Sequence, residues 1–217
     1  MTVTLEPSGG LLHGALVMQD RETDSYWSIM TGDVIAGKLK GTRLKEIPVA
    51  SKMQWKDWVK KYPNTLVLSV NGREDVPYNP YTDYFRSSEG FRGLQARDQR
   101  LESKAPIFAF EWQGEKVAIP FKVFEGGHTF HIKDTEVFLY RPKKAAIFYS
   151  TQAFQSPNGF EKRDGQWYEK HTGCRFNPDA GRFEGGEKPC QVKPFPGIDT
   201  FWYNWSLTNP NTHLLTR

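Results

Sequence analysis

Two stretches of the sequence, WKDWVKKYPNT at residues 55–65 and WYNWSLTNPNT at residues 202–212, share an uncommon spacing. Each contains Trp-x-x-Trp, then four residues, then Pro-Asn-Thr, and Trp202 follows Trp55 at an offset of 147 residues. A pattern that recurs at one long offset indicates a duplicated folding unit. If the unit is duplicated, the sequences upstream of the two stretches should match as well.

The upstream sequences do match. DRETDSYW at residues 20–27 aligns with EKHTGCRF at residues 169–176, at an offset of 149 residues. The pairs at this offset are Asp20 with Glu169, Arg21 with Lys170, Thr23 with Thr172, Ser25 with Cys174, Trp27 with Phe176, Gly32 with Gly181 and Gly37 with Gly186. The change from 149 to 147 requires only a small deletion, so the ordered matches predict an internal duplication.

Each copy begins with a predicted β-hairpin. Residues 14–28 contain two strands around a turn at Glu22–Asp24, and Gly173 takes the place of Asp24 in the second copy. Glycine and aspartate both accept left-handed turn geometry, so this pairing has a backbone reason.

Each copy then ends in a predicted helix that carries tryptophan. In the first copy Ser51 is the expected N-cap, the helix runs to about Tyr62, Pro63 ends it, and a strand is expected at residues 66–70. Its apolar stripe consists of Trp55, Trp58, Val59 and Tyr62. In the second copy the expected cap is Asp199, the stripe is Phe201, Trp202 and Trp205, and Pro210 ends the helix. Both stripes are expected to pack on a sheet, and a stacking site for a ligand is the alternative.

The segment between the copies predicts further strands. Residues 106–124 indicate a hairpin around Gly114, and residues 136–154 supply one or two strands ahead of the second copy. Those leading strands have no counterpart in the first copy at the same offset. The first copy should therefore expose a sheet edge, and self-association through this edge is expected.

These patterns predict an α+β fold that is predominantly antiparallel β, with one short Trp-bearing helix in each copy. The chain is expected to be a single structural unit over residues 1–217. Within it we place copy one at 9–70, a connecting loop and hairpin at 71–135, and copy two at 136–217.

Composition excludes several classes of protein. A net charge of +4 with scattered Lys and Arg does not indicate a nucleic-acid partner. No apolar run approaches the roughly 20 residues that span a bilayer. The N-terminal sequence lacks the regions of a signal peptide, so a cytoplasmic location is the default expectation. Two cysteines do not decide the redox compartment.

The ordered motifs resemble a prokaryotic family known only as domain-of-unknown-function family 3179. The resemblance rests on residues 8–44, the two Trp stretches and YNPYTDY at residues 78–84, and it covers Ser8 to Leu215. It implies a β-rich fold and no established activity. The family's Cys-Pro-x-Cys-like segment is absent here, and GGHTFHIKD at residues 126–134 departs from the family's Val-Asn-Asp-like stretch.

A metal or thiol site is the first candidate for chemistry. The set that could hold Zn or Cu is His128, His131, His171, Cys174 and Cys190. Spacing of i, i+3 on a strand places side chains on opposite faces, which argues against a shared metal. Alternatives for the cysteines are a reactive Cys174 with His171 as its base, or a Cys174–Cys190 disulfide.

The second candidate is an aromatic loop. Its residues Tyr78, Tyr81, Asp83 and Tyr84 suit contact with a sugar or peptide, and the alternative is a loop held on the core by its own tyrosines. No pair of carboxylates for hydrolysis can be singled out from the sequence. The glycosylation sequon at Asn204 falls inside the predicted helix, so we discount it. We therefore predict a non-catalytic binding or assembly module without a cofactor, with a metal- or thiol-dependent enzyme as the alternative.

Overall fold

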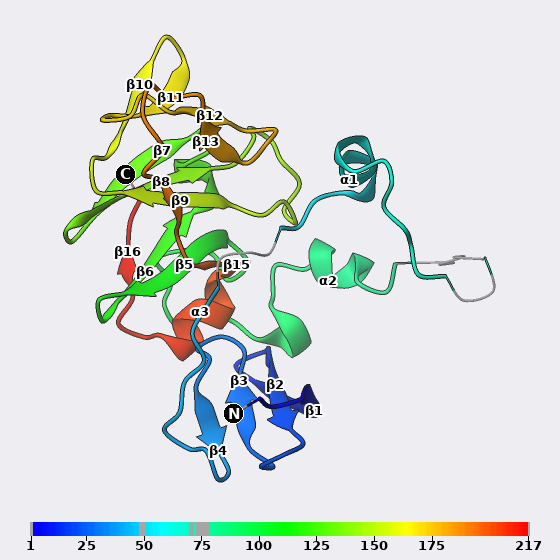
Figure 1. Cartoon of the computed structure of the whole chain (residues 1–217). Helices are drawn as coiled ribbons and strands as arrows, with labels where there is room; N and C mark the ends of the chain where they lie inside the picture. The colour runs from blue at the N-terminus through cyan, green and yellow to red at the C-terminus, as the bar shows by residue number, and fades with distance from the viewer. Residues whose placement is uncertain (1, 48–50, 70–71, 73–78, 217) are drawn as a thin grey trace.

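The computed structural model describes every residue except 1, 48–50, 70–71, 73–78 and 217. The described residues form four four-stranded sheets and three short α-helices (Figure 1). Strand β16 pairs in parallel with β6, and the other strand pairs are antiparallel. The predicted β-rich α+β class, mostly antiparallel, is therefore confirmed. None of the helices in the described part of the chain is long and apolar enough to span a membrane.

The two central sheets combine strands from the middle and from the C-terminal part of the chain, whereas the other two sheets are each built from consecutive strands. The N-terminal sheet contains β1 (Leu5–Leu12), β2 (Ala15–Asp20), β3 (Tyr26–Ser28) and β4 (Val34–Ala36). A central sheet has the order β15 (Ile198–Phe201), β5 (Pro106–Trp112), β6 (Glu115–Pro120) and β16 (His213–Leu214). A second central sheet has the order β14 (Lys193–Pro194), β9 (Gln152–Ser156), β8 (Thr135–Tyr140) and β7 (His128–Ile132). The last sheet contains β10 (Phe160–Arg163), β11 (Gln166–Glu169), β12 (Arg175–Asn177) and β13 (Arg182–Glu184).

The α-helices are α1 (Trp55–Lys61), α2 (Thr82–Arg86) and α3 (Trp202–Thr208). In Figure 1, α3 lies between the N-terminal sheet and the central strands, whereas α1 and α2 project to one side. Short 3-10 turns occur at Phe91–Gly93 and Phe121–Val123.

Strand β5 is buried on both of its faces. Because side chains alternate along a strand, Ile107 and Ala109 face α3, whereas Phe108 and Phe110 enter the core between the central sheets. Strand β8 alternates in the same way, with Phe138 packed among the phenylalanines of the last sheet. Strands buried on both faces have continuous apolar sequences, and PIFAF of β5 is such a run.

The N-terminal sheet is joined to this core through α3 and β5. Asn204 Nδ2 donates to the carbonyl of His13 at 2.9 Å, and Arg43 makes two hydrogen bonds to the Glu111 carboxylate at 3.1 and 2.8 Å. Gly14 has φ +79°, and a Cβ there would lie 3.0 Å from the Tyr203 ring. These contacts hold the sheet against the N-terminal half of α3 and against β5.

Several predicted elements are confirmed and others are wrong. The hairpins around Glu22–Asp24 and Gly114 are present as β2–β3 and β5–β6. The N-cap of α1 is Gln54 rather than Ser51, and that of α3 is Phe201 rather than Asp199. No strand forms at Leu66–Ser69, because no neighbouring strand in the described chain pairs with it, and Val70 lies outside the described residues.

Candidate functional site: an exposed surface around α1

The two Trp-bearing helices have the same local geometry. Trp58 Nε1 donates to Thr65 Oγ1 at 2.8 Å after α1, and Trp205 Nε1 donates to Thr212 Oγ1 at 2.8 Å after α3. The residues that follow the helices have nearly equal backbone angles, φ −133° and ψ 73° at Tyr62 against φ −127° and ψ 74° at Asn209. The shared Trp-x-x-Trp and Pro-Asn-Thr spacing thus corresponds to one closed helix–loop unit at each position.

The two hairpin turns also share their hydrogen bonds. The Thr23 amide donates to Asp20 Oδ1 at 2.6 Å, and the Thr172 amide donates to Glu169 Oε2 at 2.7 Å. Each carboxylate also accepts from the threonine hydroxyl. Burial raises the pKa of Glu169, but the hydrogen bonds from Thr172, Asn158 and Ser156 outweigh it and bring the pKa to about 2. Asp20 and Glu169 thus hold equivalent positions in the two turns, and each carboxylate stabilises its turn.

The helices differ in what covers them. Trp202 of α3 is 0 % exposed and packs with Ile107 and Ala109 of β5. Trp55 at the matching position of α1 is 56 % exposed, and no residue of α1 is buried. The expectation that the apolar stripe packs on a sheet therefore holds for α3 and is wrong for α1.

The segment after each helix shows the same contrast. Residues His213–Leu214 form β16, which pairs with Val117 and Ala118 of β6. At the offset of 147, the matching residues are Leu66 and Val67, and both Leu66 and Leu68 are 94 % exposed. Among the described residues, none accepts a hydrogen bond from the amides of Leu66–Leu68. We call α1, its C-cap Tyr62 and the segment Leu66–Leu68 together the docking surface.

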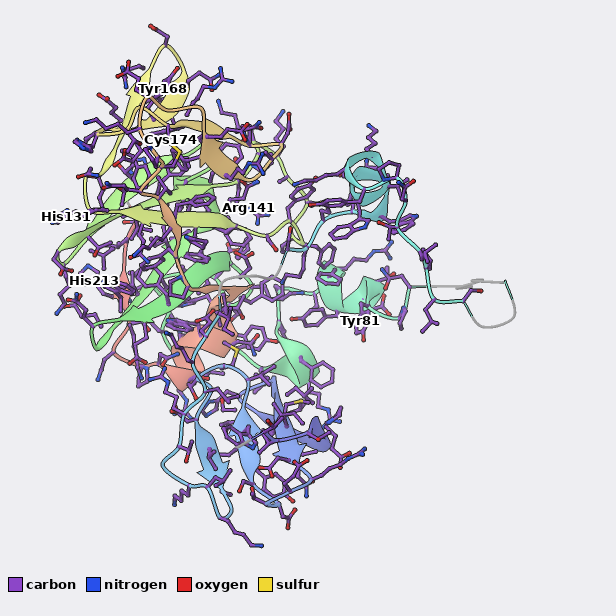
Figure 2. All side chains as sticks on the ribbon, viewed as in Figure 1. Tyr81, His131, Arg141, Tyr168, Cys174 and His213 are labelled. Atoms are coloured by element: carbon purple, nitrogen blue, oxygen red, sulfur yellow. A yellow bond between two sulfur atoms is a disulfide. The ribbon has the colours of Figure 1, made fainter. Side chains whose placement is uncertain are left out.

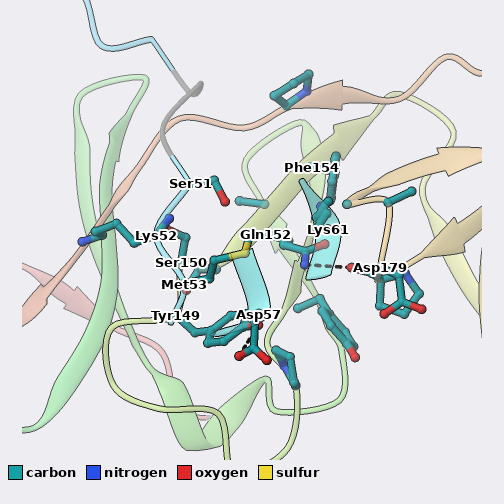
Figure 3. Close-up of a pocket in the computed structure, with 18 of the residues that line it drawn as sticks. Ser51, Lys52, Met53, Asp57, Lys61, Tyr149, Ser150, Gln152, Phe154 and Asp179 are labelled. Carbon is teal, nitrogen blue, oxygen red and sulfur yellow. Dashed lines mark hydrogen bonds between the residues drawn. The ribbon is translucent and has the colours of Figure 1, made fainter. Parts of the chain in front are cut away.

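The docking surface is attached to the core by few contacts. The backbone of Lys52 exchanges hydrogen bonds with Ser150, and Tyr149 Oη donates to Asp57 Oδ2 at 3.2 Å. Beneath α1 lies a pocket of about 760 Å³ whose walls include Asp57 and Lys61 on one side and Asp179 on the other (Figure 3). Because this pocket separates α1 from the sheets, the helix does not pack directly on the core.

The aromatic-loop candidates lie in and before α2. Tyr81 and Asp83 are exposed, whereas the Tyr84 hydroxyl lies 3.2 Å from that of Tyr203. Burial, and then this hydrogen bond, raise the pKa of Tyr84. Tyr78 lies outside the described residues. The loop thus has one tyrosine that faces solvent (Tyr81 in Figure 2) and one that anchors it to the core.

The metal and thiol candidates are not gathered into one cluster. His128 and His131 are both exposed on β7, and His171 is exposed beside Lys188, whose Nζ lies 3.4 Å from its Nε2. The described residues contain no group of three or more His, Cys, Asp or Glu placed to hold a metal ion. Figure 2 shows His131, on β7, and Cys174, between β11 and β12, in different parts of the fold.

The two cysteines are joined to each other. Cys174 and Cys190 form a disulfide with a Cα–Cα distance of 5.8 Å. Of the alternatives for these residues, the disulfide is the one found in the structure. In this form neither sulfur is a thiolate, so neither can act as a nucleophile or as a metal ligand.

The described residues form a mostly antiparallel β protein in which helix α1 and the segment Leu66–Leu68 are exposed. The chain belongs to the family described as "Protein of unknown function (DUF3179)", whose model matches residues 1–212. No curated protein and no solved structure matches the chain. The predicted family is thereby confirmed. The docking surface itself was not predicted from the sequence, which gave only the Trp-bearing helix as a pattern.

Proposed function

We propose that this chain is a binding or assembly module and that the docking surface is its contact site. The observation that carries this proposal is the contrast between Trp55, which is 56 % exposed, and Trp202, which is 0 % exposed. Contiguous exposed apolar side chains on a folded protein mark interaction sites. The surface combines Trp55, Val59 and Tyr62 of the α1 stripe with Leu66 and Leu68.

The proposal compares α1 with α3, and this comparison depends on an internal duplication of the chain. The matched Trp–Thr hydrogen bonds after α1 and α3, and the matched carboxylate–threonine bonds at Asp20 and Glu169, support descent of residues 9–70 and 136–217 from one unit. The N-terminal and last sheets also share a sequential strand order, β1-β2-β3-β4 and β10-β11-β12-β13. On this basis α3 and β16 show how a helix–strand element of this kind docks.

The contacts of α3 and β16 indicate which kind of partner would suit the docking surface. Trp202 of α3 packs on Ile107, Ala109 and Ala118, and β16 adds a parallel strand beside β6. The docking surface therefore suits a partner that presents an antiparallel β-hairpin with a small, apolar face and a free edge strand. Strand addition supplies backbone hydrogen bonds, and the indole ring fills the adjacent apolar face.

The positive charge of α1 further limits the kind of partner that would bind. Helix α1 carries Lys56, Lys60 and Lys61 against a single acid, Asp57. Opposite charges around an apolar contact increase the association rate and favour correct partners. The rim of the partner hairpin should therefore be acidic.

Hydrogen exchange with a defined probe tests this proposal. The probe is a backbone-cyclised peptide with the sequence of residues 105–120, the chain's own β5–β6 hairpin. In the chain alone the amides of Leu66–Leu68 should exchange freely, whereas the Leu215 amide, which donates to the Ala118 carbonyl at 3.0 Å, should be protected. The peptide should slow exchange at Leu66–Leu68 with micromolar affinity.

Matched variants complete the test. Trp55→Ala should abolish the slowing, and Ile35→Ala, an exposed apolar change on β4, should leave it intact. A peptide with glutamate in place of Ile107 and Ala109 should not bind. Equal slowing in the Trp55 variant would overturn the proposal. Protection that appears in the chain alone and rises with protein concentration would assign the surface to a second copy instead.

A further inference from the structure

The pocket beneath α1 has the size of a small-molecule site. Its volume is about 760 Å³, which is within the range of such sites. Its walls include α1, the loop between β8 and β9, the start of β9 and the turn between β12 and β13 (Figure 3). Clefts between separate structural units are common locations for ligands. We call this cavity the α1 pocket.

The floor of the α1 pocket lies on one face of the β8–β9 pair. Tyr140 and Gln152 are partners in the register of these two strands, so their side chains share a face. Phe154 follows Gln152 two residues later on the same face and packs with the phenylalanines of the last sheet. Gln152 Nε2 donates to the Pro178 carbonyl at 3.2 Å, which joins this floor to the turn between β12 and β13. The aromatic rings and the amide of the floor therefore lie on the same side of the sheet.

The part of the pocket at this turn offers oxygen acceptors that lack a donor. Gln152 Oε1 is buried and has no hydrogen-bond partner within the described chain. Asp179 belongs to the turn to which Gln152 is bonded, and it lines the pocket. Burial, and then the charge of Asp179, raise the pKa of Tyr140, so this carboxylate lies close to the floor. Because an unpaired buried acceptor costs free energy, the group that would suit these oxygens is a positively charged donor.

The α1 side of the pocket carries positive charge. Lys60 and Lys61 line it, whereas Asp57 of the same helix already accepts from Tyr149 Oη at 3.2 Å. In the described part of the chain, no ion pair joins either lysine to Asp57 or Asp179. Unpaired charges of both signs thus surround one cavity. A ligand with a single charge would pair with only one of them, whereas a zwitterion forms charge-assisted hydrogen bonds with both.

We propose that the α1 pocket binds a free amino acid with an aromatic side chain. The ammonium group donates to the Asp179 carboxylate and to Gln152 Oε1. The carboxylate pairs with Lys61, and the ring lies on Tyr140. Because the ligand contacts both α1 and the turn at Asp179, binding holds α1 in place relative to the sheets. The proposal does not depend on the docking surface, whose exposed tryptophan and leucines do not line the pocket.

Four related probes separate the parts of this proposal. L-Phenylalanine has the ring and both charges, 2-phenylethylamine lacks the carboxylate, 3-phenylpropanoate lacks the ammonium group, and L-alanine lacks the ring. Binding is measured by isothermal titration calorimetry and by the increase in melting temperature that a ligand of the folded state produces. L-Phenylalanine should bind saturably and more tightly than each of the other three.

Two variants that each remove one charge locate the contacts. Asp179→Asn should weaken L-phenylalanine and 2-phenylethylamine by about 3- to 10-fold without weakening 3-phenylpropanoate, because it affects only the ammonium contact. Lys61→Gln should weaken L-phenylalanine and 3-phenylpropanoate by about 3- to 10-fold without weakening 2-phenylethylamine. Both side chains are exposed, so neither variant should disturb folding.

Matched controls make the same charge changes outside the pocket. Asp164→Asn and Lys56→Gln alter exposed residues that do not line it, and both variants should bind all four probes as the original chain does. The proposal is overturned if L-phenylalanine shows no saturable binding up to about 10 mM. It is also overturned if any of the other three probes binds as tightly as L-phenylalanine, or if both pocket variants leave the affinity of L-phenylalanine unchanged. Equal weakening in the controls would attribute the effect to the overall charge of the chain and would likewise contradict the site.

Discussion

Replacing the matched tryptophans Trp202 and Trp55 with alanine should have very different effects on stability. Trp202 is 0 % exposed, packs on Ile107 and Ala109, and donates Nε1 to the Asp98 carbonyl at 2.7 Å. Removing a fully buried tryptophan costs about 3–5 kcal/mol. For a chain of this length that corresponds to a fall in melting temperature of roughly 6–20 °C.

Trp55 is 56 % exposed, so its replacement removes little buried contact. Surface changes of this kind alter stability by about 0.5 kcal/mol, and the melting temperature should move by roughly 2 °C or less. Far-UV circular dichroism should follow the unfolding, because tryptophan fluorescence changes with the substitution itself. A Trp55→Ala variant as unstable as Trp202→Ala would show that α1 is docked in solution, and the proposed contact site would not exist.

Three further predictions concern the last sheet and the turns. Glu169→Gln should destabilise the chain at neutral pH by about 1–3 kcal/mol. The folded pKa of Glu169 is lowered to about 2, so its contribution is present above about pH 4.5 and is lost as the pH falls towards 2. Urea titrations at a series of pH values should show that the difference in free energy of unfolding between the original chain and Glu169→Gln decreases as the pH falls. Reduction of the Cys174–Cys190 disulfide, which closes a separation of 16 residues, should cost about 3 kcal/mol. Free thiols in the unreduced protein by mass spectrometry would contradict this pairing. Gly37→Ala should destabilise more than Gly41→Ala, because a Cβ at Gly37 would lie 2.5 Å from a backbone Cα, whereas none lies within 4 Å at Gly41. Equal melting temperatures for the two alanine variants would refute that reason.

The parts of the fold that could be predicted depend on local chemistry. Pro63 and Pro210 end their helices one residue after the C-caps, because proline lacks the amide that a further turn requires. The hairpin turn at Asp24, where φ is 56°, was predicted because aspartate accepts left-handed geometry. These features require only a few neighbouring residues.

The features that were missed depend on distant residues. The apolar sequence LVLSV has strand composition, but a strand also needs a partner, and Leu66–Ser69 have none in the described chain. Aspartate is a common helix cap, but Asp199 lies in β15, and its carboxylate accepts a hydrogen bond at 2.8 Å from the amide of Thr151, just before β9. The α1 pocket could not be predicted either, because its walls come from segments far apart in the sequence.

The hydrogen bond from Trp58 to Thr65 has a consequence for the rate and affinity of association. It keeps α1 and the start of the following segment in the same conformation that Trp205 and Thr212 maintain inside the core. Much of the conformational entropy that a flexible peptide loses on binding is thus already lost before α1 meets a partner. Such preorganisation leaves more of the contact energy available as affinity, and it allows binding at the first correctly oriented collision.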